Sequence, residues 1–151
     1  MRQLFLLLAC TVMLIACGNS DKQSEANALL SKASDYFTEG KYAEARACID
    51  SLRKIYPNAI DTRKKALHLQ QEMELKRAQQ ELAEADSLLQ LVGHDLDYQQ
   101  TKVDRDKAAL TATPEELTML TRTRMKRDSL RTKCETLGAK IRYIRKKQKD
   151  G

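Results

Sequence analysis

Hydrophobic residues recur at every seventh position through the middle of the chain. An uninterrupted row of five leucines and one valine consists of Leu75, Leu82, Leu89, Leu96, Val103 and Leu110. Ala78, Ala85 and Val92 lie three positions after the first three of these, which gives the narrow apolar seam of a coiled coil. The pattern predicts one long helix over residues 58–110, with Asn58 as its N-cap.

Several residues modify the middle and the distal part of this predicted helix. Gly93 costs about 1 kcal/mol in a helix interior, and it offers a place for a kink. We expect the helix to continue, because the leucine register is the same on both sides of Gly93. Leu88 and Leu91 are expected to widen the seam. The companion positions beyond them are polar, at Gln99 and Asp106, so the distal part should pack less well.

The C-terminal part of the chain carries a clear helix-start signal. Thr113 suits an N-cap, Pro114 suits the first helical position, and Glu116 completes a capping box. We therefore predict a turn over residues 111–113 and a last helix over residues 114–149. Its apolar side chains form two rows, namely Leu120, Cys134 and Ile141 in one and Leu130, Leu137 and Ile144 in the other.

Residues 26–57 predict a pair of shorter helices with small residues at their contact. Ala33, Tyr36, Ala45 and Pro57 resemble the signature of a single tetratricopeptide repeat. The resemblance implies two antiparallel helices in close contact, joined by a turn at Gly40. A generic αα-hairpin is the alternative.

The repeat-like pattern is degenerate and occurs once. Leu29 and Ile49 stand where the family usually has aromatic residues. One such unit cannot bury its own apolar face, so the covering surface must come from the segment that follows. A peptide groove in this family is built by several stacked repeats, and a single unit does not predict one.

Charge is divided unevenly along the chain. Residues 1–121 hold 15 Lys and Arg against 18 Asp and Glu, whereas residues 122–151 hold 12 against 3. If the chain reverses at residues 111–113, residue 81 faces about residue 143 and residue 97 faces about residue 127. An acidic block then lies beside a basic one, namely Glu81, Glu84, Asp86, Asp95 and Asp97 beside Arg127, Arg131, Lys133, Lys140 and Arg142.

These patterns together predict an all-α fold. We expect a repeat-like αα-hairpin followed by a long antiparallel helical hairpin of coiled-coil type. Opposite charges beside the seam select this register more than they strengthen it, because exposed ion pairs contribute only ~0–1 kcal/mol each. Pairing of the leucine rows between two chains is the alternative, and it would make the protein self-associate.

The N-terminus carries a targeting pattern. One arginine precedes an apolar run over residues 4–16, which is too short to span a bilayer. The run ends in Leu14-Ile15-Ala16-Cys17, which resembles the lipobox of bacterial lipoproteins. The resemblance implies that residues 1–16 are a signal peptide that is removed and that Cys17 is lipidated. A plain signal peptide and a signal anchor are the alternatives.

Lipidation at Cys17 would attach the rest of the chain to a lipid bilayer. Residues 18–25 are polar and show no helical pattern, so we expect residues 17–25 to form a short lipidated tether. In the enterobacterial pattern an aspartate after the lipidated cysteine retains a lipoprotein at the inner membrane. Gly18 stands at that position, which favours the outer membrane, on its periplasmic side or at the cell surface.

Two other cysteines, Cys48 and Cys134, remain after removal of the signal peptide. An extracytoplasmic compartment permits a disulfide bond between them. The alternative, which we favour, is that both are small apolar core residues. Neither cysteine sits in a Cys-x-x-Cys or other metal-type spacing.

The last helix ends in a run of basic residues. The candidate contacts to an anionic surface are Arg142, Arg145, Lys146, Lys147 and Lys149. One interpretation is a solvated helix end whose cations suit the C-terminal dipole. Another is contact with anionic lipid or polymer of the envelope. We expect no nucleic-acid partner, because the signal peptide places the chain outside the cytoplasm.

No motif points to catalysis, a cofactor or a metal. The two histidines, His68 and His94, are isolated, and there is no glycine-rich phosphate loop or nucleophile elbow. The sequence therefore predicts a non-catalytic, membrane-anchored interaction or scaffold module of the cell envelope. Its partner would be an unknown envelope protein or a second copy of the chain. The alternative is a binding module for anionic envelope lipid or polymer that acts through the basic C-terminal helix.

Overall fold

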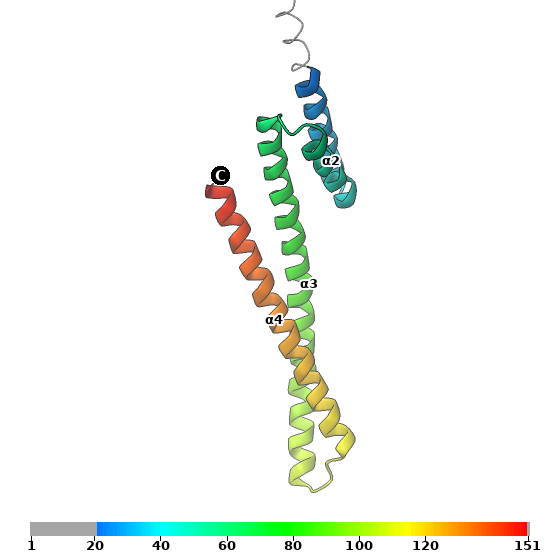
Figure 1. Cartoon of the computed structure of the whole chain (residues 1–151). Coiled ribbons are helices and arrows are strands. Elements are labelled where there is room, and N and C mark those ends of the chain that lie inside the picture. The colour runs from blue at the N-terminus through cyan, green and yellow to red at the C-terminus, as the bar shows by residue number, and fades with distance from the viewer. Residues whose placement is uncertain (1–20, 151) are drawn as a thin grey trace, which may run out of the picture. The chain divides into compact units, whose positions relative to one another are not determined.

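The computed structural model describes residues 21–150. The chain is helical over residues 21–38, and three further helices follow: α2 (Tyr42–Ile55), α3 (Ile60–Ala108) and α4 (Pro114–Asp150) (Figure 1). Residues 21–150 contain no strand, which confirms the all-α fold. The helices form two compact units, one ending at Met73 and the other beginning at Glu74, and α3 contributes to both.

A glycine-based cap ends the first helix and starts the repeat-like hairpin. Gly40 has a φ of +77°, a conformation that only glycine adopts without strain. The Gly40 N–H donates to the Phe37 carbonyl at 3.1 Å, and the Lys41 N–H donates to the Tyr36 carbonyl at 2.8 Å. This is the hydrogen-bond pattern of a Schellman motif. It reverses the chain within a few residues, so that α2 returns along the first helix.

The core of the first unit lies where the hairpin meets the start of α3. Ala33 and Ala45 are fully buried, and their small side chains let the two hairpin helices approach closely. Ile49 and Leu52 fill the space between them. The covering surface comes from α3 through Ala66, Leu69 and Met73. The expectation that the following segment covers the repeat-like hairpin is therefore confirmed.

The predicted tether over residues 17–25 is wrong for its last part, because residues 21–25 are already helical. The Gln23 amide donates to the Thr62 hydroxyl at 2.6 Å, and the Tyr56 hydroxyl donates to the Glu25 carboxylate at 2.7 Å. Thr62, only 1% exposed, also donates to the Asn27 side-chain oxygen at 2.7 Å. These contacts to α3 and to the end of α2 order residues that have no helical periodicity of their own.

The second unit is an antiparallel hairpin of α3 and α4 (Figure 1). Two apolar clusters hold it together. One contains Ala78, Ala85, Leu137 and Ile141, and the other contains Leu96, Val103 and Leu120. Within the second cluster, at a position between Leu96 and Val103, the Thr123 hydroxyl donates to the Gln99 side-chain oxygen at 3.0 Å. Residue 99 opposite residue 123 matches the predicted register to within two positions.

The long helix follows the prediction closely at its centre and less closely at its ends. α3 passes through Gly93 without interruption, as expected because the leucine register is the same on both sides of Gly93. Asn58 is not its N-cap, because the carbonyl of Ala59 accepts the hydrogen bond from the Arg63 N–H at 2.9 Å. Leu110 does not extend the seam. It follows the helix with a φ of +58° and is 95% exposed.

One expectation about the sides of the seam is wrong. Leu88 and Leu91 are exposed and do not widen it, because α4 is a single helix and covers only a narrow strip of α3. Within residues 21–150, no ion pair joins the acidic block of α3 to the basic block of α4. Glu81 pairs instead with Arg77, one turn away on the same helix, at 2.8 Å. Flexible, exposed side chains gain too little from cross-helix pairing to be held there.

Candidate functional site

The predicted lipidation site, Cys17, lies outside the described residues, as do residues 1–16 of the predicted signal peptide. Its lipidation stays a prediction. Among the helices that the structure describes, none has an apolar stretch long enough to cross a bilayer.

The two remaining cysteines are free thiols in the structure. Cys48 is half-buried against the core of the first unit, and Cys134 is half-buried against the cluster around Ala85 and Leu137 in the second. The alternative that we favoured, in which both act as small apolar residues, describes their packing. Cys48 and Cys134 form no disulfide bond in the structure.

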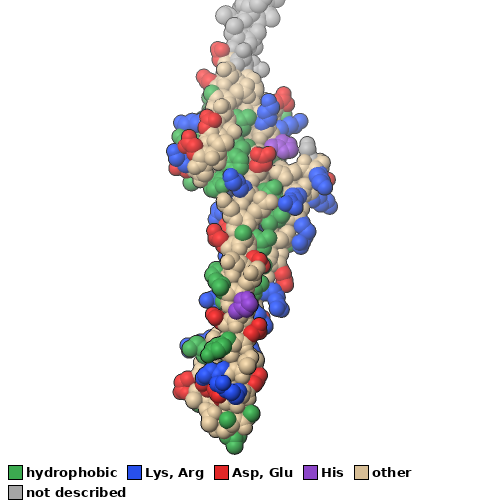
Figure 2. Space-filling view, turned by 180° about the vertical axis from the view of Figure 1, so that it is seen from behind, with side chains coloured by type: hydrophobic (Ala, Val, Ile, Leu, Met, Phe, Trp, Pro, Cys, Tyr) green, Lys and Arg blue, Asp and Glu red, His purple; other side chains and the backbone are tan. Residues whose placement is uncertain are grey.

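The predicted cationic residues lie together on the last turns of α4. Arg142, Arg145, Lys146, Lys147 and Lys149 are all exposed, while Ile141 and Ile144 point into the hairpin. Figure 2 shows Lys and Arg side chains gathered along this end of the helix. The Lys147 ammonium lies 5.8 Å from the centre of the Tyr143 ring. Within the described part of the chain these five cations form no ion pair, so the arrangement is an open cationic surface.

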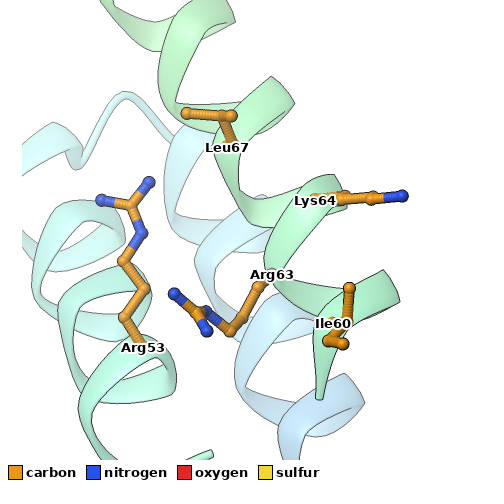
Figure 3. Close-up of a pocket in the computed structure, with 5 residues that line it drawn as sticks. All are labelled: Arg53, Ile60, Arg63, Lys64 and Leu67. Carbon is orange, nitrogen blue, oxygen red and sulfur yellow. The ribbon is translucent and has the colours of Figure 1, made fainter. Parts of the chain in front are cut away.

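A second cationic surface lies in the first unit and was not predicted. Arg53 of α2 and Ile60, Arg63, Lys64 and Leu67 of α3 line an open depression (Figure 3). Ile60 is 62% exposed and Leu67 is also exposed. The Arg63 guanidinium donates to the Pro57 carbonyl at 2.6 Å, which fixes it beside the turn between the two helices.

Sequence reasoning missed this depression because its cations come from two helices that only the fold brings together. A signal was present in the sequence. Residues 53–65 hold five Lys and Arg against one Asp. Ile60 and Leu67 lie among these charges without belonging to the buried row of Ala66, Leu69 and Met73.

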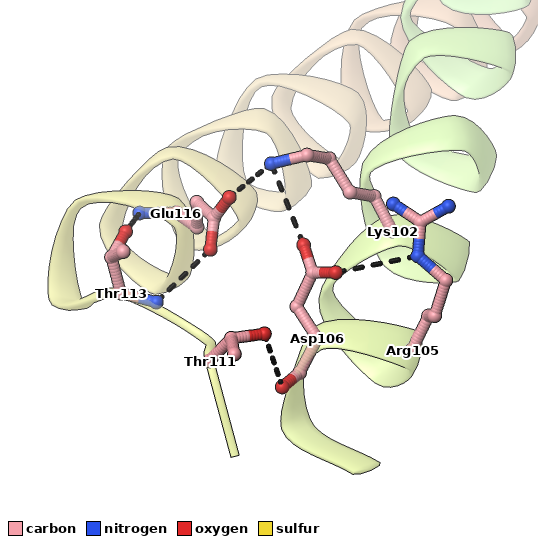
Figure 4. A network of polar contacts seen from close by, with 6 residues as sticks. All are labelled: Lys102, Arg105, Asp106, Thr111, Thr113 and Glu116. Carbon is pink, nitrogen blue, oxygen red and sulfur yellow. Dashed lines mark hydrogen bonds and ion pairs between the residues drawn. The ribbon is translucent and has the colours of Figure 1, made fainter. Parts of the chain in front are cut away.

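A polar network closes the tip of the second unit (Figure 4). The Glu116 N–H donates to the Thr113 hydroxyl at 3.2 Å, and the Thr113 N–H donates to the Glu116 carboxylate at 3.0 Å. This confirms the predicted capping box. Glu116 also forms an ion pair with Lys102 of α3. The same lysine lies 3.5 Å from the Asp106 carboxylate, so one cation links both sides of the turn.

The electrostatics of this network follow from the ion pair. The hydrogen bond from Lys102, ahead of the one from the Thr113 N–H, lowers the pKa of Glu116. The hydrogen bond to Glu116 in turn raises the pKa of Lys102. Both groups are thereby held in their charged forms. A carboxylate that is held ionised and accepts these hydrogen bonds stabilises the turn, and it is poorly suited to act as a general acid.

Within residues 21–150, no group of three or more His, Cys, Asp and Glu side chains could hold a metal ion. No family model, curated protein or solved structure matches this chain at a significant level. The described residues offer two cationic surfaces and several exposed apolar side chains as candidate contact surfaces.

Proposed function

We propose that the chain is a membrane-anchored helical envelope lipoprotein that acts as a non-catalytic protein-interaction or scaffold module. The lipobox pattern at Cys17 supports the anchor. The helical hairpin of α3 and α4 supports the interaction role, because it offers a long side surface on which a partner helix can lie. An outer-membrane location follows from Gly18 and belongs to the same proposal.

The observation that carries the interaction role is a set of large apolar side chains outside the packed seam of α3. Leu88 is 48% exposed, Leu91 is 60% exposed and Tyr98 is 72% exposed. At 3.6 residues per turn, Leu91 and Tyr98 lie more than about 100° around the helix from Ala85, which is at the centre of the seam. An apolar stripe on an exposed helix face is a typical docking surface for an amphipathic partner helix.

The partner in this proposal is another envelope protein. The leucine row of α3 is already used within the hairpin, against α4, so it is not available to pair two chains. We therefore expect the purified protein to sediment as a monomer. A doubled mass, with a helix content that rises with concentration, would favour pairing between chains instead.

A second candidate function is supported by the cationic end of α4. Five exposed Lys and Arg side chains without an ion pair are suited to an anionic lipid or polymer of the envelope. Contact of this kind depends on charge, so it weakens as salt is added. Contact through an apolar helix face changes little under the same conditions.

Salt and matched variants together separate the two candidates. The lipidated chain would be used as bait for detergent-solubilised envelope at low and moderate ionic strength. One variant, Leu91→Glu with Tyr98→Glu, removes the apolar stripe, and the other, Lys147→Gln with Lys149→Gln, removes two cations. We expect a captured protein that resists salt and is lost only with the first variant. Capture that collapses with salt and is lost only with the second would replace the proposal by the alternative.

A further inference from the structure

We infer that the first unit contacts an anionic bilayer surface through the end at which α2 meets α3. The contact residues are Arg53, Ile55, Ile60, Arg63, Lys64 and Leu67, and we refer to them as the basal surface. This inference rests on the proposed lipid anchor at Cys17. It adds an orientation of the first unit and a second, non-covalent contact with lipid headgroups.

The anchor and the basal surface lie at the same end of the first unit. Gln23 and Glu25 are bonded to Thr62 and Tyr56, at the start of α3 and the end of α2. Four residue steps separate Cys17 from Asp21, and a fully extended chain covers at most about 3.6 Å per step. Asp21 is therefore held within about 14 Å of the lipidated cysteine. The Gly40 end lies about 25 Å further along the helix axis, at 1.5 Å per residue.

The charges of the basal surface match an anionic membrane. This surface contains three cations, Arg53, Arg63 and Lys64, and no acidic residue. Within the described part of the chain, neither Arg53 nor Lys64 has an acidic partner. Figure 3 shows the Arg53 and Arg63 side chains in the space between the two helices, while Lys64 points outward. Lipid phosphates can approach these groups without displacing an existing ion pair.

Apolar side chains lie among these cations. Ile55 is 59% exposed, Ile60 is 62% exposed and Leu67 is 47% exposed. An acidic peptide would pair with the cations but would not need two exposed isoleucines beside the anchored end. A bilayer interface accepts both groups at once, because phosphates contact the cations while the apolar side chains enter the acyl boundary.

The absence of tryptophan from the chain allows a direct test of this orientation. Ile60→Trp would place a single fluorophore on the basal surface. Ala43→Trp, at an exposed position near the Gly40 end of the same unit, is the matched control. The lipidated full-length chain would be reconstituted into phosphatidylcholine vesicles with and without phosphatidylglycerol, and brominated lipids would serve as quenchers. Circular dichroism would verify that both variants keep their helix content.

We expect quenching and a blue shift for Ile60→Trp in the anionic vesicles, and neither effect for Ala43→Trp. Adding Arg53→Gln and Lys64→Gln to Ile60→Trp should lower the membrane-contacting population about fivefold per charge removed. Protein that floats with the vesicles while Ile60→Trp stays unquenched would overturn the inference and leave the anchor standing. Equal quenching in both vesicle types, or at both ends of the unit, would also overturn it. Protein without lipid on Cys17, measured by mass spectrometry, would remove both proposals.

Discussion

The two isoleucines of α2 allow a sharp test of the core of the first unit. Ile49 is 1% exposed and belongs to the central cluster, whereas Ile55, six residues later on the same helix, is 59% exposed. Replacing either one by alanine removes the same three carbon atoms. The gain in helix propensity is a few tenths of a kcal/mol at Ile49 and smaller at Ile55, the last residue of α2, so a larger loss of stability at Ile49 reports on burial.

The expected magnitude follows from the surroundings of Ile49. Three buried carbons at about 0.8 kcal/mol each give a transfer term of about 2.4 kcal/mol. The remaining cavity should add about 1 kcal/mol, because the neighbouring Ala33, Ala45 and Ala66 are too small to fill it. Ile49→Ala should therefore lower the free energy of unfolding by about 3.5 kcal/mol, and Ile55→Ala by less than about 0.5 kcal/mol.

Urea unfolding followed by far-UV circular dichroism measures both variants. The midpoint should fall for Ile49→Ala while the slope of free energy against urea stays unchanged, because the same surface is exposed on unfolding. Equal losses in the two variants, or a loss below about 1 kcal/mol for Ile49→Ala, would show that α2 does not pack as described.

Three further predictions concern the turns and the long helices. Gly93→Ala should raise the free energy of unfolding by about 1 kcal/mol, since a Cβ there meets no atom within 4 Å. Gly40→Ala should lower it by about 1 kcal/mol, because Gly40 has a φ of +77°. Urea unfolding measures both variants. Thr113→Ala should cost about 1 kcal/mol through loss of the cap, while Thr118→Ala on the exposed surface should cost less than about 0.5 kcal/mol, by the same assay. The pKa of Glu116 is lowered in the folded state, so its contribution to stability is present above its unfolded pKa and is lost as pH falls through the folded value. The free energy of unfolding, measured by urea at several acidic pH values, should therefore depend less on pH for Glu116→Gln than for the wild type.

The sequence was most informative where one local signal fixes the structure. The capping box at Thr113 and Glu116 needs only residues within one turn of each other, and it forms as predicted. The heptad row from Leu75 to Val103 extends over about eight turns of helix, so one misplaced position such as Leu110 does not change the result. The burial of Val103 and Leu96 follows directly from that row.

The remaining features depend on which side chains meet in space. The helicity of residues 21–25 is stabilised by Thr62 and Tyr56, which lie more than thirty positions away in the sequence. The depression between Arg53 and Arg63 likewise requires α2 and α3 to be packed. The two charge blocks form no cross-helix ion pair within residues 21–150, because exposed charges gain too little energy to select one rotamer.

A polar contact within the second apolar cluster limits how α3 and α4 can pair. Thr123 meets Gln99 at 3.0 Å, and the turn and capping box hold the hairpin close to this register. A slip by one heptad would separate the two polar side chains and place Thr123 opposite Val92 or Asp106, depending on its direction, leaving Gln99 without its partner. No slip of α4 along the same seam can cover Leu91 and Tyr98, because they lie more than about 100° away around α3. Their exposure is therefore a consequence of the best-packed hairpin, and only a molecule outside it can bury them.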